Sequence, residues 1–541
     1  MRNISTDSEL QHLFERVCFH AERFGRTLPE MRFFILNSME FVSLLEKNVY
    51  PVSPVNIWEG RNVINKKHRI ESGQESALYY EVVQTGNPSY AYLNHTNSAM
   101  MQASVMAHVV GHCEFSELNV LKDSNPDRTE KVMHLVKKVD MGRYQMGDKN
   151  YMQYWNACES MIPLIQPNSQ YNVENSVETN FKLNRAKEIE QKNEQLLKKE
   201  RSVFSHTLDS LLKNKSSENL FKEEIKTKSR KETLNRKGYK LRAPCQDIFG
   251  FLRDHAPSSE AEKSILSYMY TVHQTHDFVL KTQIMNEGWA MYWEKKIMLE
   301  LFKERAVKGV IDYSKVFSGV CYPRPFFQRN PYHLGYHMWI DIEEDLKKGK
   351  INIDYVEEID QKKKEAWDKP QEQDAVDQMT HIVQTCTDYE FLRRYLTLQG
   401  VEKYHLNRID KRMVRSLGID PQDIVKENDF YVWIDPGPVK EYMLNFFTHC
   451  HRPRIYIIDT DFMDGGLLLF HRDDGQKLKK EWISPTLKNI NLLWKGPVAL
   501  MSGTSLHQYG SGRYKETEVE ALKFEDVLDR MKKDEKPFRI K

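Results

Sequence analysis

The sequence predicts a mostly helical α+β fold that ends in a small β-containing C-terminal domain. Three observations support this prediction. Long stretches without proline carry the apolar periodicity of amphipathic helices through most of the chain. Two short β-rich runs, SALYYEVV and SYAYLNH, flank a Gly-Asn-Pro turn, which indicates a hairpin. After residue 428, short segments alternate apolar and polar residues around Gly and Asp turns, as strands do.

Length and composition exclude several classes of protein. A chain of 541 residues is too long for one ordinary core, so we expect two or three units. The 79 Lys and Arg residues nearly balance the 77 Asp and Glu residues, which argues against a dedicated nucleic-acid binder. The sequence has no apolar run of about 18 residues, so no transmembrane segment is expected, and its start lacks the apolar region of a secretory signal. Seven scattered cysteines without a CxxC pair indicate a reduced, cytoplasmic setting.

The first expected unit is an N-terminal helical region over residues 1–74. Helices are predicted within residues 8–48, on either side of a Gly-Arg-Thr-Leu-Pro break, and a Pro-rich irregular connection follows. The predicted hairpin comes next. An Asn-Ser cap signal then starts a helix that is expected from about residue 98 to residue 118, because no proline interrupts it.

The predicted core covers residues 75–179 and 241–428, and an insert interrupts it. Residues 180–240 are rich in Lys, Glu, Asn and Ser, which is typical of a solvated helical or partly disordered segment. The alternative is an arm that binds protein partners. Beyond the insert, SSEAE is a capped start for a proline-free stretch of one long helix or two. A further helix begins near Pro331, and residues 429–541 form the C-terminal β-containing domain.

Two histidines, His108 and His112, lie four residues apart in the helix predicted over 98–118. On a helix this spacing places them about 40° apart on one face. Two neutral imidazoles so placed can share a divalent cation, as in zincin metalloenzymes. The hairpin also precedes this helix where zincin folds have an edge strand that pairs with extended substrate. The alternative is packing without a metal, because HxxxH is a short motif and a catalytic zinc usually has three protein ligands.

Glu287 is the candidate for the third ligand. It interrupts the apolar stretch IMNEGWAMYW, and a glutamate is rarely buried unless it is paired or binds a metal. The alternative is a salt bridge to a nearby Lys or Arg. If the surrounding helix is continuous, Gln283 and His276 share the face of Glu287 and could hydrogen-bond the ligands. For His276 an ordinary surface position is the simpler interpretation.

The glutamate base of HExxH peptidases is absent, because Val109 follows His108. Glu114 cannot simply replace it, since it projects about 240° away from His108 on a helix. The base must therefore come from another segment, or hydrolysis must proceed without a carboxylate helper. A second HxxxH pair, His333 and His337, lies beside tyrosines, and a Tyr or His there could stabilise an oxyanion, although helix packing is the simpler interpretation.

Several blocks of the sequence resemble the stage V sporulation protein R (SpoVR) family. They are AYLNHTNSAMMQASVMAHVVGHCEF, YWNACESMIPLI, IMNEGWAMYW, NPYHLGYHMWIDI and TDYEFLRRYLT, and they occur in family order between about residues 75 and 400. The resemblance implies a cytoplasmic protein of bacteria or archaea that is linked to spore cortex formation. It also implies a zincin-like metal site at His108, His112 and Glu287, and it suggests a hydrolase of peptide or amide bonds, including those of peptidoglycan.

The chain departs from the family pattern close to the first block. Glu114 stands where the family has Asp, Phe115-Ser116 replaces an aromatic pair, and Leu118-Asn119 replaces Asn-Asn. These changes affect the expected substrate preference more than the expected metal binding.

Together, the residues and the resemblance predict a zinc-dependent amide or peptide hydrolase of zincin-like fold. The catalytic candidates are Glu114, Tyr336 and His337, and the candidates for substrate binding are Asn119 and Asn286. The expected substrate is a peptide or a peptidoglycan-type molecule, and no nucleic acid is expected. The alternative is a non-catalytic, metal-stabilised scaffold for cell-wall or sporulation partners, which the missing glutamate after His108 supports.

Overall fold

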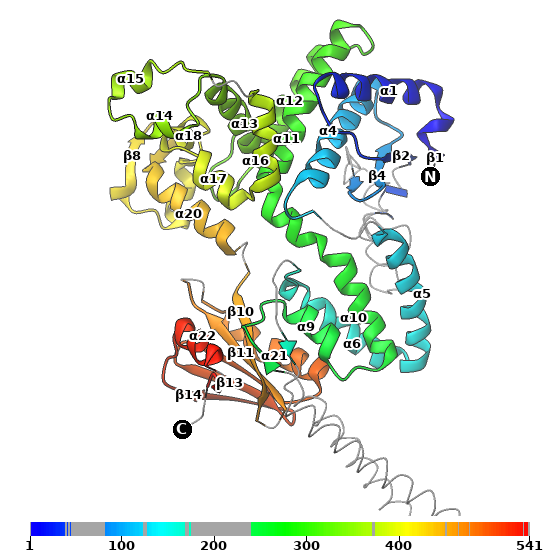
Figure 1. Cartoon of the computed structure of the whole chain (residues 1–541), viewed down its shortest axis with the longest axis vertical. Helices are drawn as coiled ribbons and strands as arrows, with labels where there is room; N and C mark the ends of the chain where they lie inside the picture. Colours follow the sequence, from blue (N-terminus) through cyan, green and yellow to red (C-terminus); the bar gives the residue numbers. More distant parts are fainter. Residues whose placement is uncertain are drawn as a thin grey trace, which may run out of the picture. The chain divides into compact units, whose positions relative to one another are not determined.

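The chain divides into two units in the computed structural model (Figure 1). The first comprises Met1–Met133 and Thr275–His451, and the second comprises His134–Gln274 and Arg452–Lys541. Within them, the structure describes residues 2–37, 40–41, 44, 82–122, 127–167, 173–174, 240–370, 374–449, 452–463, 465–474, 477–533 and 535–538. The predicted insert over 180–240 lies outside the described residues except for Lys240.

The division differs from the predicted domain boundaries, which were 75–179 with 241–428 for the core and 429–541 for the C-terminal domain. Residues 134–274 belong with the C-terminal sheet, and the segment up to His451 belongs with the first unit. Those boundaries followed changes in composition along the chain. Contacts between segments that are far apart in sequence decide the units instead; an example is the backbone bridge between Cys245 and Ile457.

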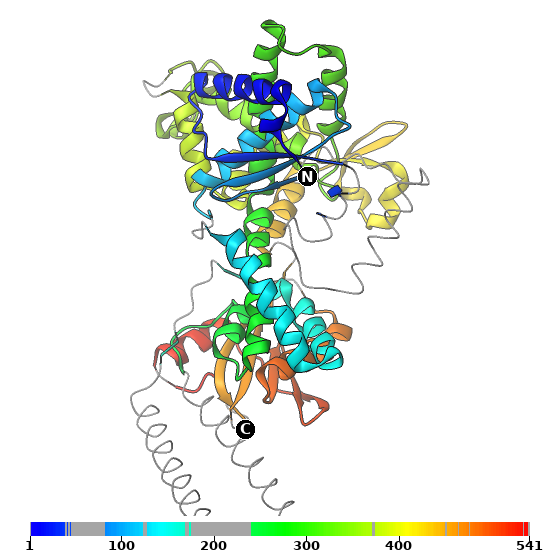
Figure 2. The ribbon, with the colours of Figure 1, turned by 90° about the vertical axis from the view of Figure 1, so that its right-hand side faces the viewer.

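The first unit contains a four-stranded mixed sheet in the order β1-β2-β4-β3. Figure 2 shows helix α1 (dark blue) running along one side of its strands. β2 and β4 are parallel, with Met31 opposite Ser89, while β1 and β3 pair antiparallel with their neighbours. The β3–β4 pair confirms the predicted hairpin. The strands are β1 (Arg2–Asn3), β2 (Met31–Leu36), β3 (Val82–Gln84) and β4 (Ser89–Asn94).

Strand β2 shows that the prediction of helices throughout residues 8–48 is wrong in part. Helix α1 (Ser8–Arg23) forms as predicted, but MRFFIL is extended, with Phe33 and Ile35 buried. The periodicity of a short apolar run does not distinguish a strand from a buried helix. Pairing with β4 decides the matter here, because strand formation depends on the neighbours across the sheet.

Helices form most of the remainder of the first unit, together with a three-stranded antiparallel sheet in the order β7-β9-β8. The helices are α4 (Ala99–Leu118), α11 (Thr275–Lys303), α12 (Val310–Val320), α13 (Pro331–Lys347), α14 (Ile353–Glu357), α15 (Gln361–Glu365), α16 (Ala375–Thr385), α17 (Asp388–Tyr395), α18 (Leu398–Lys403), α19 (Val414–Leu417) and α20 (Pro436–His449). The strands are β7 (Arg408–Asp410), β8 (Ile424–Glu427) and β9 (Tyr431–Ile434). The start of α13 at Pro331 confirms the predicted helix.

The second unit is built around a five-stranded sheet in the order β10-β11-β12-β13-β14, in which only β11 and β12 are parallel. Its strands are β10 (Arg454–Phe462), β11 (Gly466–Arg472), β12 (Val498–Ser502), β13 (Ser505–Gly510) and β14 (Arg513–Glu518), and a short pair joins β5 (Val173–Glu174) to β6 (Lys240–Leu241). Its helices are α6 (Asp148–Ser160), α9 (Ile248–His255), α10 (Glu260–His273), α21 (Lys480–Trp494) and α22 (Phe524–Lys532), and α5 (Arg128–Met146) enters it from the first unit. The sheet confirms the predicted β-containing C-terminal region.

The proline-free stretch that follows SSEAE forms two helices rather than one. A turn at Gln274 separates α10 from α11, and the two helices belong to different units. The predicted cap is present at the start of α10. Ser259 Oγ accepts a hydrogen bond from Glu262 N, and the Glu262 carboxylate accepts one from Ser259 N.

Helix α4 agrees with its predicted extent and is buried on almost every side. The Ser98 hydroxyl oxygen caps its start by accepting a hydrogen bond from Met101 N. Residues 102–115 are all buried. Burial on every side is expected of a helix in the core of a large protein. Here α4 packs against α11, which in turn packs against α13.

Glycines allow these three helices to approach closely. A Cβ atom added to Gly111 of α4 would lie 2.6 Å from Ala290 Cα of α11. A Cβ atom added to Gly288 of α11 would overlap the backbone of Gly335 in α13. A Cβ atom added to Gly335 would overlap Ile284 O of α11. The glycines in VVGH, NEGW and HLGYH are therefore explained by backbone contact between helices.

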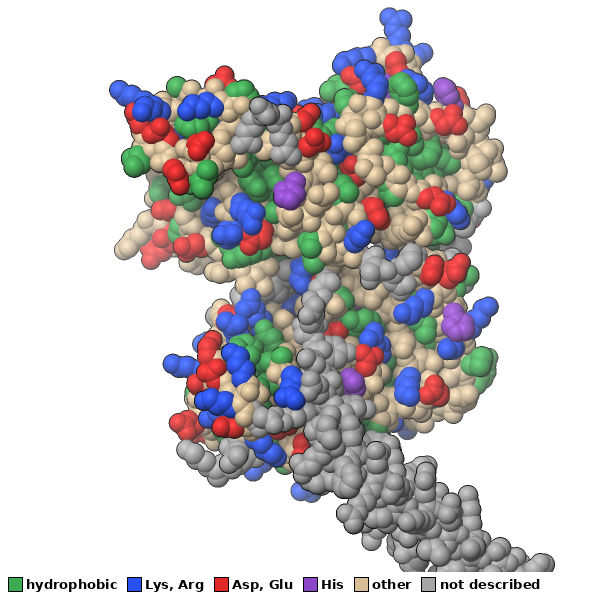
Figure 3. Space-filling model, viewed as in Figure 1, with side chains coloured by type: hydrophobic (Ala, Val, Ile, Leu, Met, Phe, Trp, Pro, Cys, Tyr) green, Lys and Arg blue, Asp and Glu red, His purple; other side chains and the backbone are tan. Residues whose placement is uncertain are grey.

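The surface carries both signs of charge. On the face that Figure 3 shows, Lys and Arg side chains are interspersed with Asp and Glu. In the part of the chain that the structure describes, no helix combines the length and the apolar character needed to cross a bilayer.

Candidate metal centre

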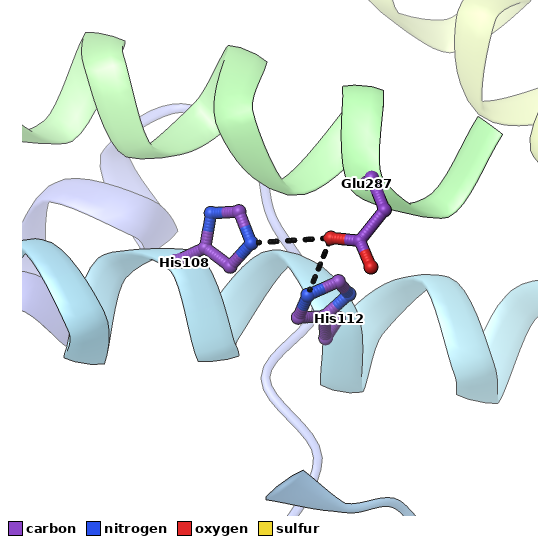
Figure 4. Close-up of side chains that lie close together, drawn as sticks. All are labelled: His108, His112 and Glu287. Carbon is purple, nitrogen blue, oxygen red and sulfur yellow. Dashed lines mark ion pairs between the residues drawn. The ribbon is translucent and has the colours of Figure 1, made fainter. Parts of the chain in front are cut away.

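Two imidazoles and one carboxylate converge between helices α4 and α11 (Figure 4). Glu287 Oε2 lies 3.6 Å from His108 Nε2 and 3.4 Å from His112 Nε2. One ligand atom from each residue lies within 4.8 Å of the other two. Two ligands of a tetrahedral zinc ion, each at roughly 2.0–2.1 Å, are separated by about 3.3–3.4 Å. The two separations between imidazole and carboxylate are therefore close to those expected for one shared cation, and the three residues that the sequence nominated lie together.

The second nitrogen of each imidazole is held by a side chain of α11. His108 Nδ1 lies 2.9 Å from Glu294 Oε2, and His112 Nδ1 lies 2.9 Å from Asn286 Oδ1. Both partners are oxygen acceptors, so a neutral ring must carry its proton on Nδ1. Nε2 then presents its lone pair toward Glu287. This is the orientation that metal-binding histidines have when an outer carboxylate or carbonyl supports them.

Glu294 was not foreseen from the sequence. Its carboxylate bridges two residues of α4, because Oε1 also accepts a hydrogen bond of 2.6 Å from Ser104 Oγ. The available signal was spacing: Glu294 follows Glu287 by two helical turns and so shares its face. The residues proposed for this supporting role, Gln283 and His276, are instead exposed.

The surroundings of Glu287 favour its ionised form. Burial raises the pKa of this carboxyl, but when His112 and His108 are protonated, their charge and hydrogen bonds outweigh burial and hold the pKa well below its usual range. Glu287 Oε2 is buried and has no hydrogen-bond partner among the described residues. A buried carboxylate oxygen that faces two imidazole nitrogens is a suitable donor for a divalent cation.

Two further blocks of the sequence support the turn of α11 that precedes Glu287. The carboxylate of Asp388 accepts hydrogen bonds from Ile284 N at 2.8 Å and Met285 N at 2.9 Å. Burial raises the pKa of Asp388 to about 8, and these backbone N–H groups oppose that shift. Trp339 Nε1 donates to Met285 O at 3.1 Å. The blocks TDYEFLRRYLT and NPYHLGYHMWIDI thus meet beside the candidate ligands.

Glu114, a catalytic candidate, does not join the cluster. Its carboxylate accepts hydrogen bonds from Thr27 N and Trp289 Nε1 and forms a buried ion pair of 3.3 Å with Arg26. Burial raises the pKa of Glu114, whereas the Arg26 charge and the hydrogen bonds lower it. The large angle around α4 from His108 explains this position. The described contacts tie α4 to α11 and to the segment after α1.

Asn119 and Tyr336 are also engaged away from the cluster. Asn119 Nδ2 donates to Val383 O at 2.7 Å and to Cys386 O at 3.0 Å, which joins the end of α4 to the end of α16. The buried Tyr336 hydroxyl oxygen accepts a hydrogen bond of 2.6 Å from Lys295 Nζ. Of Asn119 and Asn286, the two residues predicted to bind substrate, only Asn286 hydrogen-bonds a candidate metal ligand, which is His112.

The second HxxxH pair has the contacts of a packing motif. His333 Nδ1 lies 2.9 Å from Cys321 O, and its Nε2 lies 3.2 Å from Tyr404 O. His337 stacks on Tyr404, with ring centroids 6.1 Å apart. Burial and the neighbouring His333 lower the pKa of His337 to about 4, so its ring is neutral near pH 7. These contacts place both rings against α18 and its surroundings rather than against His108.

A cavity of about 470 Å³ lies beside His108. Glu294 and Tyr332 also line it, and the Tyr332 ring centroid lies 6.2 Å from that of His108. Tyr332 of the block NPYHLGYHMW therefore shares this cavity with a candidate ligand. The volume of this cavity is within the range of about 300–1,000 Å³ that small-molecule sites occupy.

Comparisons with known proteins agree with the blocks in the sequence. The model of a family described as "SpoVR like protein" matches residues 5–431. The chain is similar to a protein of Escherichia coli (strain K12) named "Uncharacterized protein YcgB", with 26% identity over 305 residues. This match covers 54% of the chain and 55% of the relative, so the chain spans about half the length of the curated relative it matches. No solved structure matches the chain. Glu287 and Asp388 lie inside the matched range, and strands β10–β14 lie beyond it.

Proposed function

The chain belongs to the family of SpoVR-like proteins, and from this premise we propose that it is a zinc-dependent hydrolase of amide bonds. His108, His112 and Glu287 hold the metal. The strongest support is the convergence of two imidazoles, each hydrogen-bonded through Nδ1, on one carboxylate oxygen. Three protein ligands leave a fourth position open, as in catalytic zinc sites. When bound, zinc supplies a Lewis acid and lowers the pKa of water to about 7.

The residues around the ligands have separate tasks in this proposal. Glu294 and Asn286 orient the two imidazoles and keep their Nε2 atoms available. The cavity beside His108 receives the substrate, and the Tyr332 hydroxyl donates a hydrogen bond to the carbonyl oxygen as negative charge develops on it. Strand β3, at the edge of its sheet and just before β4 and α4, is the proposed zincin-like edge for an extended substrate.

The biological setting in the proposal comes from the family resemblance. It favours peptidoglycan-type peptides as substrates and spore cortex formation as the process. A cytoplasmic location is part of the same proposal and is supported by the scattered cysteines, none of which forms a disulfide within the described residues.

A non-catalytic scaffold is the second candidate function. Val109 occupies the position of the HExxH base, and Glu114 is committed to Arg26. The carboxylate of Glu294 reaches the cavity but is bound by Ser104 and His108. A metal that only stabilises the contact between α4 and α11 would need none of these groups as a base.

Peptide hydrolysis distinguishes the two functions. We expect the zinc-loaded protein to release new amines from a panel of short peptides and peptidoglycan fragments, measured by mass spectrometry. His112→Ala should abolish release, whereas His381→Ala, which changes an exposed histidine on α16, should not. Absence of new amines from the wild-type protein, with zinc bound in full, would favour the scaffold.

The supporting carboxylate gives a milder prediction. Glu294→Gln should weaken zinc binding by about 10–100-fold, because His108 loses its charged acceptor while the shape of the side chain is kept. Competition with a chromophoric zinc chelator measures this change. Glu402→Gln, at an exposed position of α18, is the matched control and should leave the affinity unchanged. Equal affinities of the two variants would remove the supporting role from Glu294.

A further inference from the structure

The cavity beside His108 carries two arginines on its wall. Arg324 and Arg329 lie in the segment between α12 and α13 and line the same space as His108 and Glu294. Glu294 is the acidic side chain of this lining, and it is bound by Ser104 and His108. The two arginines therefore bring positive charge to the wall of the cavity.

The segment that bears the arginines is held in place by its own contacts. Asn330 Nδ2 donates to Val320 O at 2.7 Å and to Tyr322 O at 2.8 Å, and Asn330 Oδ1 accepts from Tyr332 N. The guanidinium carbon of Arg329 lies 3.2 Å from the centroid of the Phe446 ring. A guanidinium that is stacked in this way keeps its planar set of donors oriented, which suits recognition of a carboxylate or phosphate.

Arg324 provides a second charge at the same cavity. Its side chain is exposed. An exposed guanidinium and a stacked one that line the same cavity can act together on one anionic group. Hydrogen bonds from a guanidinium to a carboxylate or phosphate are among the stronger hydrogen bonds in proteins.

The remaining lining is mainly apolar. Met101, Val105, Met291, Phe317 and Val320 contribute to it. The cavity thus offers an apolar space, a positively charged region and an edge that reaches His108. An amino-acid residue with an apolar side chain and a free carboxylate presents matching groups within a few bonds of its amide nitrogen.

We propose that the cavity binds the C-terminal residue of an acyl amino acid or peptide, with its free carboxylate on Arg324 and Arg329 and its apolar side chain among the apolar residues. This inference rests on the proposed function, because it places the last amide bond beside His108. The reaction is then of carboxypeptidase type. Hydrolysis breaks the C–N bond, adds the hydroxyl of water to the carbonyl carbon and transfers the other proton of water to the leaving amine.

Equilibrium binding tests the proposal without requiring turnover. N-acetylphenylalanine, as each enantiomer, and N-acetylphenylalaninamide are titrated into the zinc-loaded full chain by calorimetry. We expect at least about tenfold tighter binding of one or both acids than of the corresponding amide, which equals about 1.4 kcal/mol. Arg324→Gln should reduce this preference several-fold, and the double variant with Arg329→Gln should abolish it. Arg415→Gln, on the exposed side of α19, is the matched control.

The outcomes separate the two proposals. Equal binding of acid and amide, or a preference that survives in the Arg324→Gln and double variants, overturns the carboxylate site. If inorganic phosphate displaces neither N-acetylphenylalanine nor its amide, the result supports a site for carboxylates rather than phosphates. If phosphate binds and the protein does not prefer the acid to the amide, the carboxylate site is overturned. Peptides with free and amidated C-termini complete the test. Selective binding without cleavage contradicts the hydrolase alone, and cleavage of both peptides at equal rates contradicts the carboxylate site alone.

Discussion

Replacing Glu287 with alanine is expected to reduce the metal content of the purified protein from about one zinc ion per chain to near zero. The substitution removes the anionic ligand and leaves two imidazoles, too few to hold a catalytic zinc ion. His108→Ala and His112→Ala should have the same effect, because each removes one of three ligands. Metal analysis by inductively coupled plasma mass spectrometry, on protein purified with limiting zinc, measures the loss.

Two controls make this result specific to the cluster. His381→Ala and Glu402→Ala change exposed residues of the same unit and should keep the wild-type zinc content. Thermal unfolding with added zinc gives an independent measure, since a ligand that binds the native state at about 1,000 times its Kd stabilises it by about 4 kcal/mol. The wild-type protein should gain this stability and Glu287→Ala should not. Unchanged zinc content in all three ligand variants would exclude the metal centre.

Gly288→Ala is expected to destabilise the first unit and to lower its zinc content together. The added methyl group would overlap the backbone of Gly335, so α11 and α13 would have to separate. Overpacking of a core typically costs about 1–3 kcal/mol, and a clash with backbone leaves little room for relief by side-chain rotation. Because Glu287 is the preceding residue, the shift of α11 should also move its carboxylate. Differential scanning calorimetry and metal analysis of the same preparation measure both effects.

The matched control is the same substitution in another helix. A Cβ atom added to Gly319 of α12 meets no atom within 4 Å, and the backbone there is not left-handed. Gly319→Ala should therefore keep or raise the unfolding temperature, because alanine favours a helix by about 1 kcal/mol over glycine. If both variants melted at the same temperature, the close contact between α11 and α13 would be wrong.

The supporting groups show where prediction from sequence stops. His108 and His112 could be paired because they are one helical turn apart, and Glu287 could be nominated because it interrupts an apolar stretch. Asn286 was assigned to substrate, but it contacts His112. Glu114 was assigned to catalysis, but it pairs with Arg26, which lies far from it in the sequence. Such roles depend on which residue of another segment comes within hydrogen-bonding distance, and spacing along one helix carries no information about that.

The fold, like the candidate site, was predictable from the sequence only in its local features. Local periodicity, capping and turn residues were enough to predict the extent of α4, the β3–β4 hairpin and the placement of His108 and His112 on one face of a helix. Contacts in the folded chain were needed to show that MRFFIL is a strand, that residues 134–274 share a unit with the C-terminal sheet, and that Glu294 supports His108. Each of these depends on contacts between segments that are distant in the chain, and a strand, a unit boundary or a hydrogen-bond partner exists only once those segments meet.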